Sequence, residues 1–443
     1  MSNPLTRIVG RAVDARENEL AALVWSAAYF FFVLSAYYVL RPIRDEAGVA
    51  GGVDNLAWLF TGTLVGMLLV HPLFAGLVAR LPRRRFVPLT YRFFILHLIG
   101  FFLLYTFVDP SKSVWIGRVF FVWASIFNLF VVSVFWSFMT DIYRPGQSKR
   151  LFGMVAVGGS IGAITGSTIT SALAGPLGPV NLLLVSALLL EFACRASHAL
   201  EKHEPALAAA ADEEDRPLSN ASADPPAIPD RTEEIIGGGV LEGMRRVASS
   251  PYLLGIAGLM LCFTIASTFL YFQQAEIVEQ AFGEDREART RLFANRDLVV
   301  NTLTLLTQLF LTGRILRWFG IGSALAFLPV LSLIGFGVLG LAPVLGVVIF
   351  FEVLRRTGNF AIQRPAREAL YTILPRKDKY KAKNFNDTFV YRAGDQIGAW
   401  SYTAMGWLGL GLSGLAFCMV PLSALWLLLA LWLGRTSRRL REQ

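Results

Sequence analysis

Residues 351–396 read FEVLRRTGNFAIQRPAREALYTILPRKDKYKAKNFNDTFVYRAGDQ, which places many charges inside two otherwise apolar helical stretches. A charge at the centre of a membrane helix costs at least about 2.5–3.5 kcal/mol, so such residues usually face a bundle interior or a water-filled cavity. Spacing of four residues on one helix face predicts three ion pairs: Glu352 with Arg356, Arg364 with Glu368, and Lys383 with Asp387. Arg367 and Arg392 have no opposite charge at that spacing, so this stretch is the first candidate for a polar pathway.

The composition of the whole chain favours a membrane protein. The chain has 443 residues, 54% of them hydrophobic, and apolar runs of about twenty residues recur along it. We therefore expect an all-α polytopic membrane protein with 12 transmembrane helices. These helices are predicted at 20–42, 56–79, 86–108, 113–142, 150–174, 178–197, 251–278, 291–316, 321–341, 343–374, 384–408 and 411–434.

The predicted spans divide into two sets of six. Residues 199–239 are rich in Ala, Pro, Asp and Glu and show no apolar periodicity, so we expect a disordered linker there. The expected organisation is an N-terminal segment 1–19, a six-helix half 20–198, the linker 199–239, a second half 240–434 and a tail 435–443. This layout resembles that of major-facilitator-type transporters, whose two halves are repeats around a site at the bilayer midplane.

Charge distribution predicts the orientation. Lys and Arg are far more frequent in the segments on the side of both termini than in the opposite loops, so both termini are expected in the cytoplasm. The first nineteen residues contain no apolar core of a cleavable signal, so the first span itself is the expected insertion signal.

Other function classes lack their signatures. Cys194, Cys262 and Cys418 are far apart and show no metal-ligand spacing, so we expect free thiols and no metal site. No phosphate-binding loop for ATP hydrolysis and no nucleic-acid recognition module is present. We expect no cofactor, no covalent chemistry, no nucleic-acid partner and a monomer in the lipid bilayer.

Two glycine patterns need an interpretation. Gly158, Gly162 and Gly166 recur every four residues and predict close packing of two helices, or alternatively a smooth seam that slides between conformations. Gly409, Gly411 and Gly414 have the spacing of a dinucleotide-binding loop, but they join two spans without a preceding strand. We interpret this second pattern as a turn.

The end of the first span combines tyrosines with charges. Tyr37 and Tyr38 precede Arg41, Pro42, Arg44 and Asp45. Pro42 lacks a backbone donor and is expected to end or kink the helix. One interpretation is a cluster of side chains that reach the membrane edge; the other is an anion gate whose rings stack on a base. Further arginines inside predicted spans are Arg92, Arg118, Arg296, Arg355 and Arg356.

Three motifs together resemble a known family. Pro365 to Leu374, Lys379 to Asp387 and Arg392 to Gly394 closely resemble the signature of the ATP:ADP antiporter family, the nucleotide exchangers of plastids and intracellular bacteria. The run from Leu40 to Asp45 is similar to the pattern of its first span, with Arg44 where the exchangers have a lysine. The stretches 133–136 and 266–269 lack acidic residues that the family carries, and Arg364 stands where an Asp is usual.

The resemblance implies transport of a nucleotide or related phosphorylated anion by exchange, through alternating access, in a bacterial inner membrane. The expected anion contacts are Arg41, Arg44, Arg118, Arg296, Arg367, Lys381, Lys383 and Arg392, with Tyr37 and Tyr38 against the base. Asp45, Glu368, Asp387 and Asp395 are expected to form charge pairs that open and close. Two alternatives stay open: a carrier of another organic anion or a proton-coupled solute, and a non-transporting membrane sensor or lipid scramblase.

Overall fold

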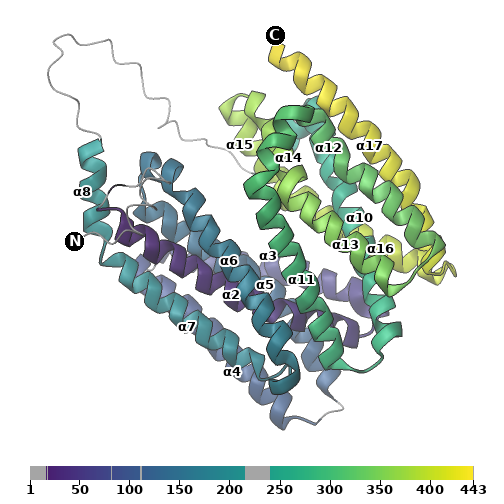
Figure 1. Ribbon diagram of the computed structural model, residues 1–443, viewed down its shortest axis with the longest axis horizontal. Helices are drawn as coiled ribbons and strands as arrows, with labels where there is room; N and C mark the ends of the chain where they lie inside the picture. The colour runs from purple at the N-terminus through teal and green to yellow at the C-terminus, as the bar shows by residue number, and fades with distance from the viewer. Residues whose placement is uncertain (1–15, 17, 81, 110–111, 215–239, 443) are drawn as a thin grey trace. The chain divides into compact units, whose positions relative to one another are not determined.

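The computed structural model describes residue 16 and residues 18–80, 82–109, 112–214 and 240–442, and the regular structure in these ranges is helical (Figure 1). The helices of the first half of the chain are α2 (Leu20–Ala50), η1 (Val53–Asn55), α3 (Leu56–Arg80), α4 (Arg83–Phe107), α5 (Ser113–Ile142), α6 (Pro145–Leu177), α7 (Leu182–Glu201) and α8 (Glu204–Glu214). The second half contains α9 (Val240–Ser249), α10 (Pro251–Phe282), α11 (Arg286–Phe310), α12 (Thr312–Leu341), α13 (Leu345–Gly358), η3 (Asn359–Gln363), α14 (Arg364–Leu370), η4 (Tyr371–Ile373), α15 (Arg376–Phe385), η5 (Asn386–Val390), α16 (Tyr391–Trp407) and α17 (Leu412–Glu442).

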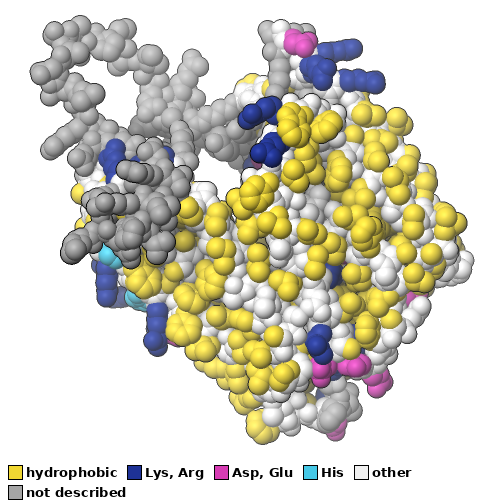
Figure 2. All heavy atoms as spheres, in the orientation of Figure 1, with side chains coloured by type: hydrophobic (Ala, Val, Ile, Leu, Met, Phe, Trp, Pro, Cys, Tyr) yellow, Lys and Arg dark blue, Asp and Glu magenta, His cyan; other side chains and the backbone are white. Residues whose placement is uncertain are grey.

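Most of the long helices are apolar enough to cross a membrane. Within the described residues, nine helices meet the length and composition required of a span: α2, α3, α4, α5, α6, α7, α10, α12 and α17. α11 and the segments α13–α14 and α15–α16 occupy the other three predicted positions, but they carry more charge. Hydrophobic side chains cover much of the visible surface in Figure 2, as expected for helices that contact lipid. The prediction of an all-α polytopic membrane protein is confirmed.

The chain forms two compact units. Unit 1 contains residues 1–44 and 66–235, and unit 2 contains residues 45–65 and 236–443. Residues 45–65, which the sequence assigns to the first six-helix half, therefore pack with unit 2. The C-terminal end of α2, η1 and the beginning of α3 supply this segment. The buried charges of Asp45 and Glu46 thereby belong to the interior of unit 2.

In unit 1, α6 packs directly against the backbone of α2. A Cβ atom added at Gly158, Gly162 or Gly166 would collide with the carbonyl oxygen of Ala27, Phe31 or Ser35, respectively. The hydroxyl of Ser35 donates to the carbonyl of Gly162 at 3.0 Å, which fixes the register of the two helices. The glycine spacing thus serves close helix packing, as predicted.

The beginning of the predicted linker is ordered, which corrects one expectation. Residues 199–201 complete α7, and α8 spans Glu204–Glu214. Leu207 and Ala210 are fully buried, and their carbonyls accept hydrogen bonds from Gln147 at 3.0 Å and Arg16 at 2.7 Å. These tertiary contacts stabilise a helix that shows no apolar periodicity. The remainder of the predicted linker, 215–239, lies outside the described residues.

Two predicted helix ends are also wrong. α2 continues through Pro42 to Ala50, because proline removes a single backbone donor while Ile43, Ala47 and Val49 remain buried around it. α17 continues to Glu442, so residues 435–442 of the predicted tail are helical. The turn predicted around Gly409 is confirmed, since this residue lies between α16 and α17 with a φ of +86°.

The two charged helices contain irregular turns. The segments 359–363 and 386–390 are π-helical. A π turn takes one more residue than an α turn, so it changes which side chains share a face. The three cysteines are free, as predicted. No group of metal-ligating side chains occurs among the residues that the structure describes.

Candidate functional site

Buried charges are concentrated in unit 2. The buried charged side chains of this unit are Asp45, Glu46, Arg289, Arg296, Asp297, Glu352, Arg355, Arg356, Arg367 and Asp395. They come from the end of α2 and from α11, α13, α14 and α16. Because isolated charges are costly in a low-dielectric interior, the partner of each side chain indicates its role.

Arg296 is fully occupied by protein acceptors. Its guanidinium donates to Asp45 at 2.6 Å, to Gln274 at 2.7 Å and to Asp297 at 3.0 Å. Arg356 of α13 donates to the same Asp297 at 2.6 Å. This network connects α2, α10, α11 and α13. Arg296 and Asp45 were predicted as substrate and gating residues, and the structure gives both of them protein partners.

A second ion-pair group surrounds Glu46. Arg289 donates to this carboxylate at 2.9 Å, and Arg286 donates to it at 3.3 Å. Arg289 also donates to the carbonyl of Gly283 at 2.9 Å. No sequence pattern indicates Glu46, Arg286 and Arg289 as a group, because their ion pairs join residues that are 240 or more positions apart.

Arg355 has a different environment. Its Nη2 donates to the Ser267 hydroxyl of α10 at 2.6 Å, and its Nε lies 3.9 Å from the Glu352 carboxylate. The guanidinium carbon lies 5.5 Å from the centre of the Phe263 ring. Nε and Nη1 are buried without a hydrogen-bond partner among the described residues. Arg355 therefore retains donor capacity for a bound group.

Arg367 has even more donor capacity than Arg355. It is 8% exposed; the Asp387 carboxylate interacts with it electrostatically, but no carboxylate of the described residues lies within ion-pair distance of it. Its Nε has no hydrogen-bond partner among those residues, and neither has either polar atom of Gln363, one turn earlier on the same face. Tyr391 of α16 lies within electrostatic range of Arg392, Arg355 and Arg367. We call Phe263, Ser267, Arg355, Gln363, Arg367 and Tyr391 the central arginine site.

The predicted pairs at the edge of this site are partly wrong. Arg392 does have a partner, since it donates to Asp395 three residues later at 3.2 Å. Lys383 pairs with Glu368 at 2.7 Å rather than with Asp387. Asp387 lies in the π segment that begins at residue 386 and is exposed; it interacts with Lys383 electrostatically without forming the predicted ion pair.

The other predicted pairs change as well. Arg356 pairs with Asp297, and Glu352 lies nearest to Arg355. Arg364 is exposed, and Lys381 is half-buried. None of the three predicted pairs within a helix is among the ion pairs of the described residues; Arg356, Glu368 and Lys383 form ion pairs between helices instead.

The predicted residues of unit 1 have aromatic partners. Tyr37 and Tyr38 contact each other edge-on, with ring centres 5.2 Å apart. The aromatic contacts of the arginines are Arg41 over Tyr38 at 5.7 Å, Arg44 over Phe121 at 5.1 Å and Arg118 over Trp115 at 4.6 Å. Arg44 also lies 3.5 Å from the Ser125 hydroxyl.

Long apolar helices around buried, partly unsatisfied charges define a polytopic membrane protein with a polar interior, as in carriers of polar solutes. The sequence model of the Major Facilitator Superfamily matches residues 20–363. The chain therefore belongs to this superfamily, which consists of secondary carriers rather than enzymes.

Solved structures support the same fold. A bacterial homologue of the human lysosomal transporter Spinster, in an inward-facing and unoccupied conformation, is 13% identical with a TM-score of 0.57, covering 96% of this chain and 98% of its own. An auto-inhibited POT family peptide transporter is 15% identical with a TM-score of 0.57, covering 94% and 97%. The POT family transporter PepTSo is 14% identical with a TM-score of 0.59, covering 95% and 98%. No curated protein matches the chain.

Proposed function

We propose that this carrier transports a phosphorylated anion of the nucleotide type by exchange, through alternating access, and that the central arginine site binds the anionic group. The observation that carries the proposal is Arg367, a buried guanidinium with no carboxylate of the described residues in ion-pair range. A buried charge without a partner is costly, whereas a bound anion supplies both the opposite charge and the missing acceptors.

The chemistry of the site favours phosphate or carboxylate. Guanidinium groups donate two parallel hydrogen bonds to such oxygens, and both Arg355 and Arg367 have donors that the described residues leave without a partner. Gln363 adds an amide that can donate and accept. The rings of Phe263 and Tyr391, with centres 6.4 Å apart, offer apolar surface beside the charges. Together these groups suit a ligand with an anionic part and a planar part.

The resemblance to the nucleotide exchangers supports the substrate class. It covers Pro365 to Gly394, which includes Arg367, Lys381, Lys383 and Arg392. We assign Arg367 to anion binding and Arg392 to the pair with Asp395, which exchanges partners when substrate arrives. Lys383 and Glu368 form a second pair that opens during transport. Tyr37, Tyr38, Arg41, Arg44 and Arg118 are the proposed contacts of unit 1.

The proposed setting is a bacterial inner membrane, with both termini in the cytoplasm and a monomer as the functional unit. The excess of Lys and Arg on the side of the termini supports this orientation.

Ligand-induced thermal stabilisation of Arg367→Gln tests the proposal. Purified protein is titrated with ATP, ADP and inorganic phosphate, because a ligand that binds only the folded state raises Tm, and at equal concentration a tighter ligand raises it more. We expect wild type to be stabilised by nucleotide. Arg367→Gln should fold with nearly the same Tm but lose that stabilisation, and Arg367→Lys should regain part of it.

The matched control is Arg296→Gln. Removing one partner of a buried ion network costs about 3–5 kcal/mol, so this variant should lose much of its stability without ligand. An unchanged nucleotide response in Arg367→Gln would remove Arg367 from the site. An absence of any response in wild type would contradict the substrate class.

A further inference from the structure

Two long helices of unit 2, α12 and α17, lie side by side in Figure 1. The backbones of Gly322 and Gly434 are in near contact, and Gly340 lies against the Phe417 ring. Residue numbers along one helix rise as those along the other fall, so the two helices are antiparallel. Residues 312–321 precede the Gly322 contact on α12, with a break in the helix at Gly320, whose φ is +73°, and residues 435–442 follow the same contact on α17.

These two segments carry five exposed arginines: Arg314, Arg317, Arg435, Arg438 and Arg439. None of them forms an ion pair with a carboxylate of the described residues. The sequences of α12 and α17 contain a single acidic residue, Glu442, at the end of α17. Among the described residues of α12 and α17, the arginines of these segments therefore have no acidic neighbour other than Glu442. Dark-blue side chains gather near the C-terminus in Figure 2.

Exposed apolar side chains lie among these arginines. Trp318 is 68% exposed, Phe319 63% and Leu440 42%. Tryptophan and arginine together are typical of the boundary between hydrocarbon and headgroups, where the ring lies at headgroup depth and the cation reaches phosphate. We call these eight residues the terminal basic surface.

The same helices continue directly into a lipid-facing surface. Ile334 of α12 is 58% exposed, and Leu425 and Leu428 of α17 are 58% and 65% exposed. A partner that contacts the terminal basic surface therefore also meets an apolar surface beside it. A phospholipid fits both surfaces, because its acyl chain can contact the apolar side chains and its phosphate can bind the arginines.

We propose that the terminal basic surface binds the headgroups of anionic phospholipids in the adjacent leaflet. Charge complementarity and continuity with the apolar helix faces carry this inference, which is independent of the transported substrate. Basic residues near an anionic membrane surface each strengthen binding by roughly fivefold at low salt. Screening makes the interaction weaker at high ionic strength.

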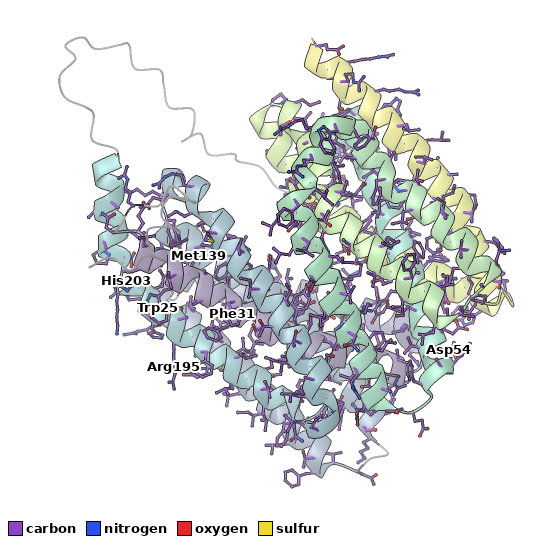
Figure 3. All side chains as sticks on the ribbon, in the orientation of Figure 1. Trp25, Phe31, Asp54, Met139, Arg195 and His203 are labelled. Carbon is purple, nitrogen blue, oxygen red and sulfur yellow. The ribbon has the colours of Figure 1, made fainter. Side chains whose placement is uncertain are left out.

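The test measures how many lipids stay bound to the purified full-length protein, by native mass spectrometry, after equilibration with phosphatidylglycerol and phosphatidylcholine. The test variant is Arg435→Gln/Arg438→Gln/Arg439→Gln. The charge-matched control is Arg92→Gln/Arg195→Gln/Arg291→Gln, whose arginines are exposed and paired with Glu191 or Glu287. Arg195 extends away from α7 in Figure 3.

We expect wild type and the control to prefer phosphatidylglycerol, and the test variant to lower that preference on the order of 100-fold at low salt. A second test variant, Arg314→Gln/Arg317→Gln, is used if the triple substitution impairs folding. We expect it to lower the preference for phosphatidylglycerol on the order of tenfold. Three results would overturn the proposal: no lipid preference in wild type, an equal loss in the control, or displacement of the lipid by soluble glycerol phosphate.

Discussion

Each nitrogen of the Arg296 guanidinium donates to a protein acceptor, whereas Arg367 has no carboxylate of the described residues within ion-pair range. Both are buried arginines on helices that carry several charges, and neither has an acid four residues away. The cost of burying these two charges is therefore offset by different partners. The Arg296 network stabilises unit 2 by itself, and we assign Arg367 to the substrate.

Arg392 lies between these two cases, because it pairs with Asp395 at 3.2 Å while its side chain is 36% exposed. Arg392→Gln leaves the Asp395 carboxylate without this partner. We expect a loss of about 1–2 kcal/mol, less than a fully buried pair loses, since solvent screens an exposed partner. The double variant Arg392→Gln/Asp395→Asn should recover thermal stability but not transport. Equal Tm values for wild type and Arg392→Gln would contradict a stabilising pair.

Glu19, just before α2, gives unit 1 a pH-dependent contact. Burial raises the pKa of its carboxyl, but hydrogen bonds from Arg150 at 3.0 Å, Gln147 at 3.1 Å and the Arg16 backbone outweigh this and bring the pKa below its ordinary value of 4.5. A lowered folded pKa adds stability above the unfolded pKa, and that stability is lost as pH falls through the folded pKa.

This prediction is tested by measuring the Tm of wild type and of Glu19→Gln from pH 7 to pH 3.5. The stabilisation of wild type relative to the variant should stay constant down to about pH 4.5 and then shrink. A difference that grows as pH falls would contradict the assignment.

At the scale of helices, the tightest contact in unit 1 is the line of three glycines on α6. Gly162→Ala would place a methyl group against the Phe31 carbonyl, which cannot move without separating the two backbones. Overpacking of this kind costs about 1–3 kcal/mol. Gly153→Ala is the matched control on the same helix, because a Cβ there meets nothing within 4 Å. We expect a lower Tm for Gly162→Ala and an unchanged or higher Tm for Gly153→Ala, since alanine favours helix. If both variants melt alike, the contact is not close.

The positions of most helices could be predicted from apolar runs, because a span must bury its backbone hydrogen bonds and expose apolar side chains to lipid. Their ends could not be predicted as well. α2 passes Pro42 because its end is packed in unit 2, and α8 forms because Gln147 and Arg16 bind its carbonyls. Such long-range contacts leave no local pattern.

The site could be predicted only in part. Spacing on a regular α-helix identified Arg367 as an arginine with no acid four residues away, and in the structure its Nε has no hydrogen-bond partner among the described residues. Spacing failed for Lys383, because it pairs with Glu368 of another helix, and for Arg296, because its partners lie on other helices. Arg355 carried no distinguishing mark in the sequence, although its donors now lie beside Phe263 and Ser267.

At the scale of the whole molecule, the protein is a secondary carrier, and the anion site that we propose lies inside unit 2. Superfamily membership and the fold establish the carrier class. The substrate class depends on the central arginine site, where Arg355 and Arg367 have donors with no partner among the described residues. Exchange requires that bound substrate, rather than an empty site, accompany the change of conformation.

The most direct test is counterflow in proteoliposomes. Vesicles that contain the purified carrier and are preloaded with ADP should accumulate labelled ATP, while vesicles without internal nucleotide should accumulate little. Arg367→Gln should abolish the accumulation at an equal amount of reconstituted, folded protein. If labelled ATP enters preloaded and empty vesicles equally, or enters neither while another anion is transported, nucleotide exchange at this site is contradicted.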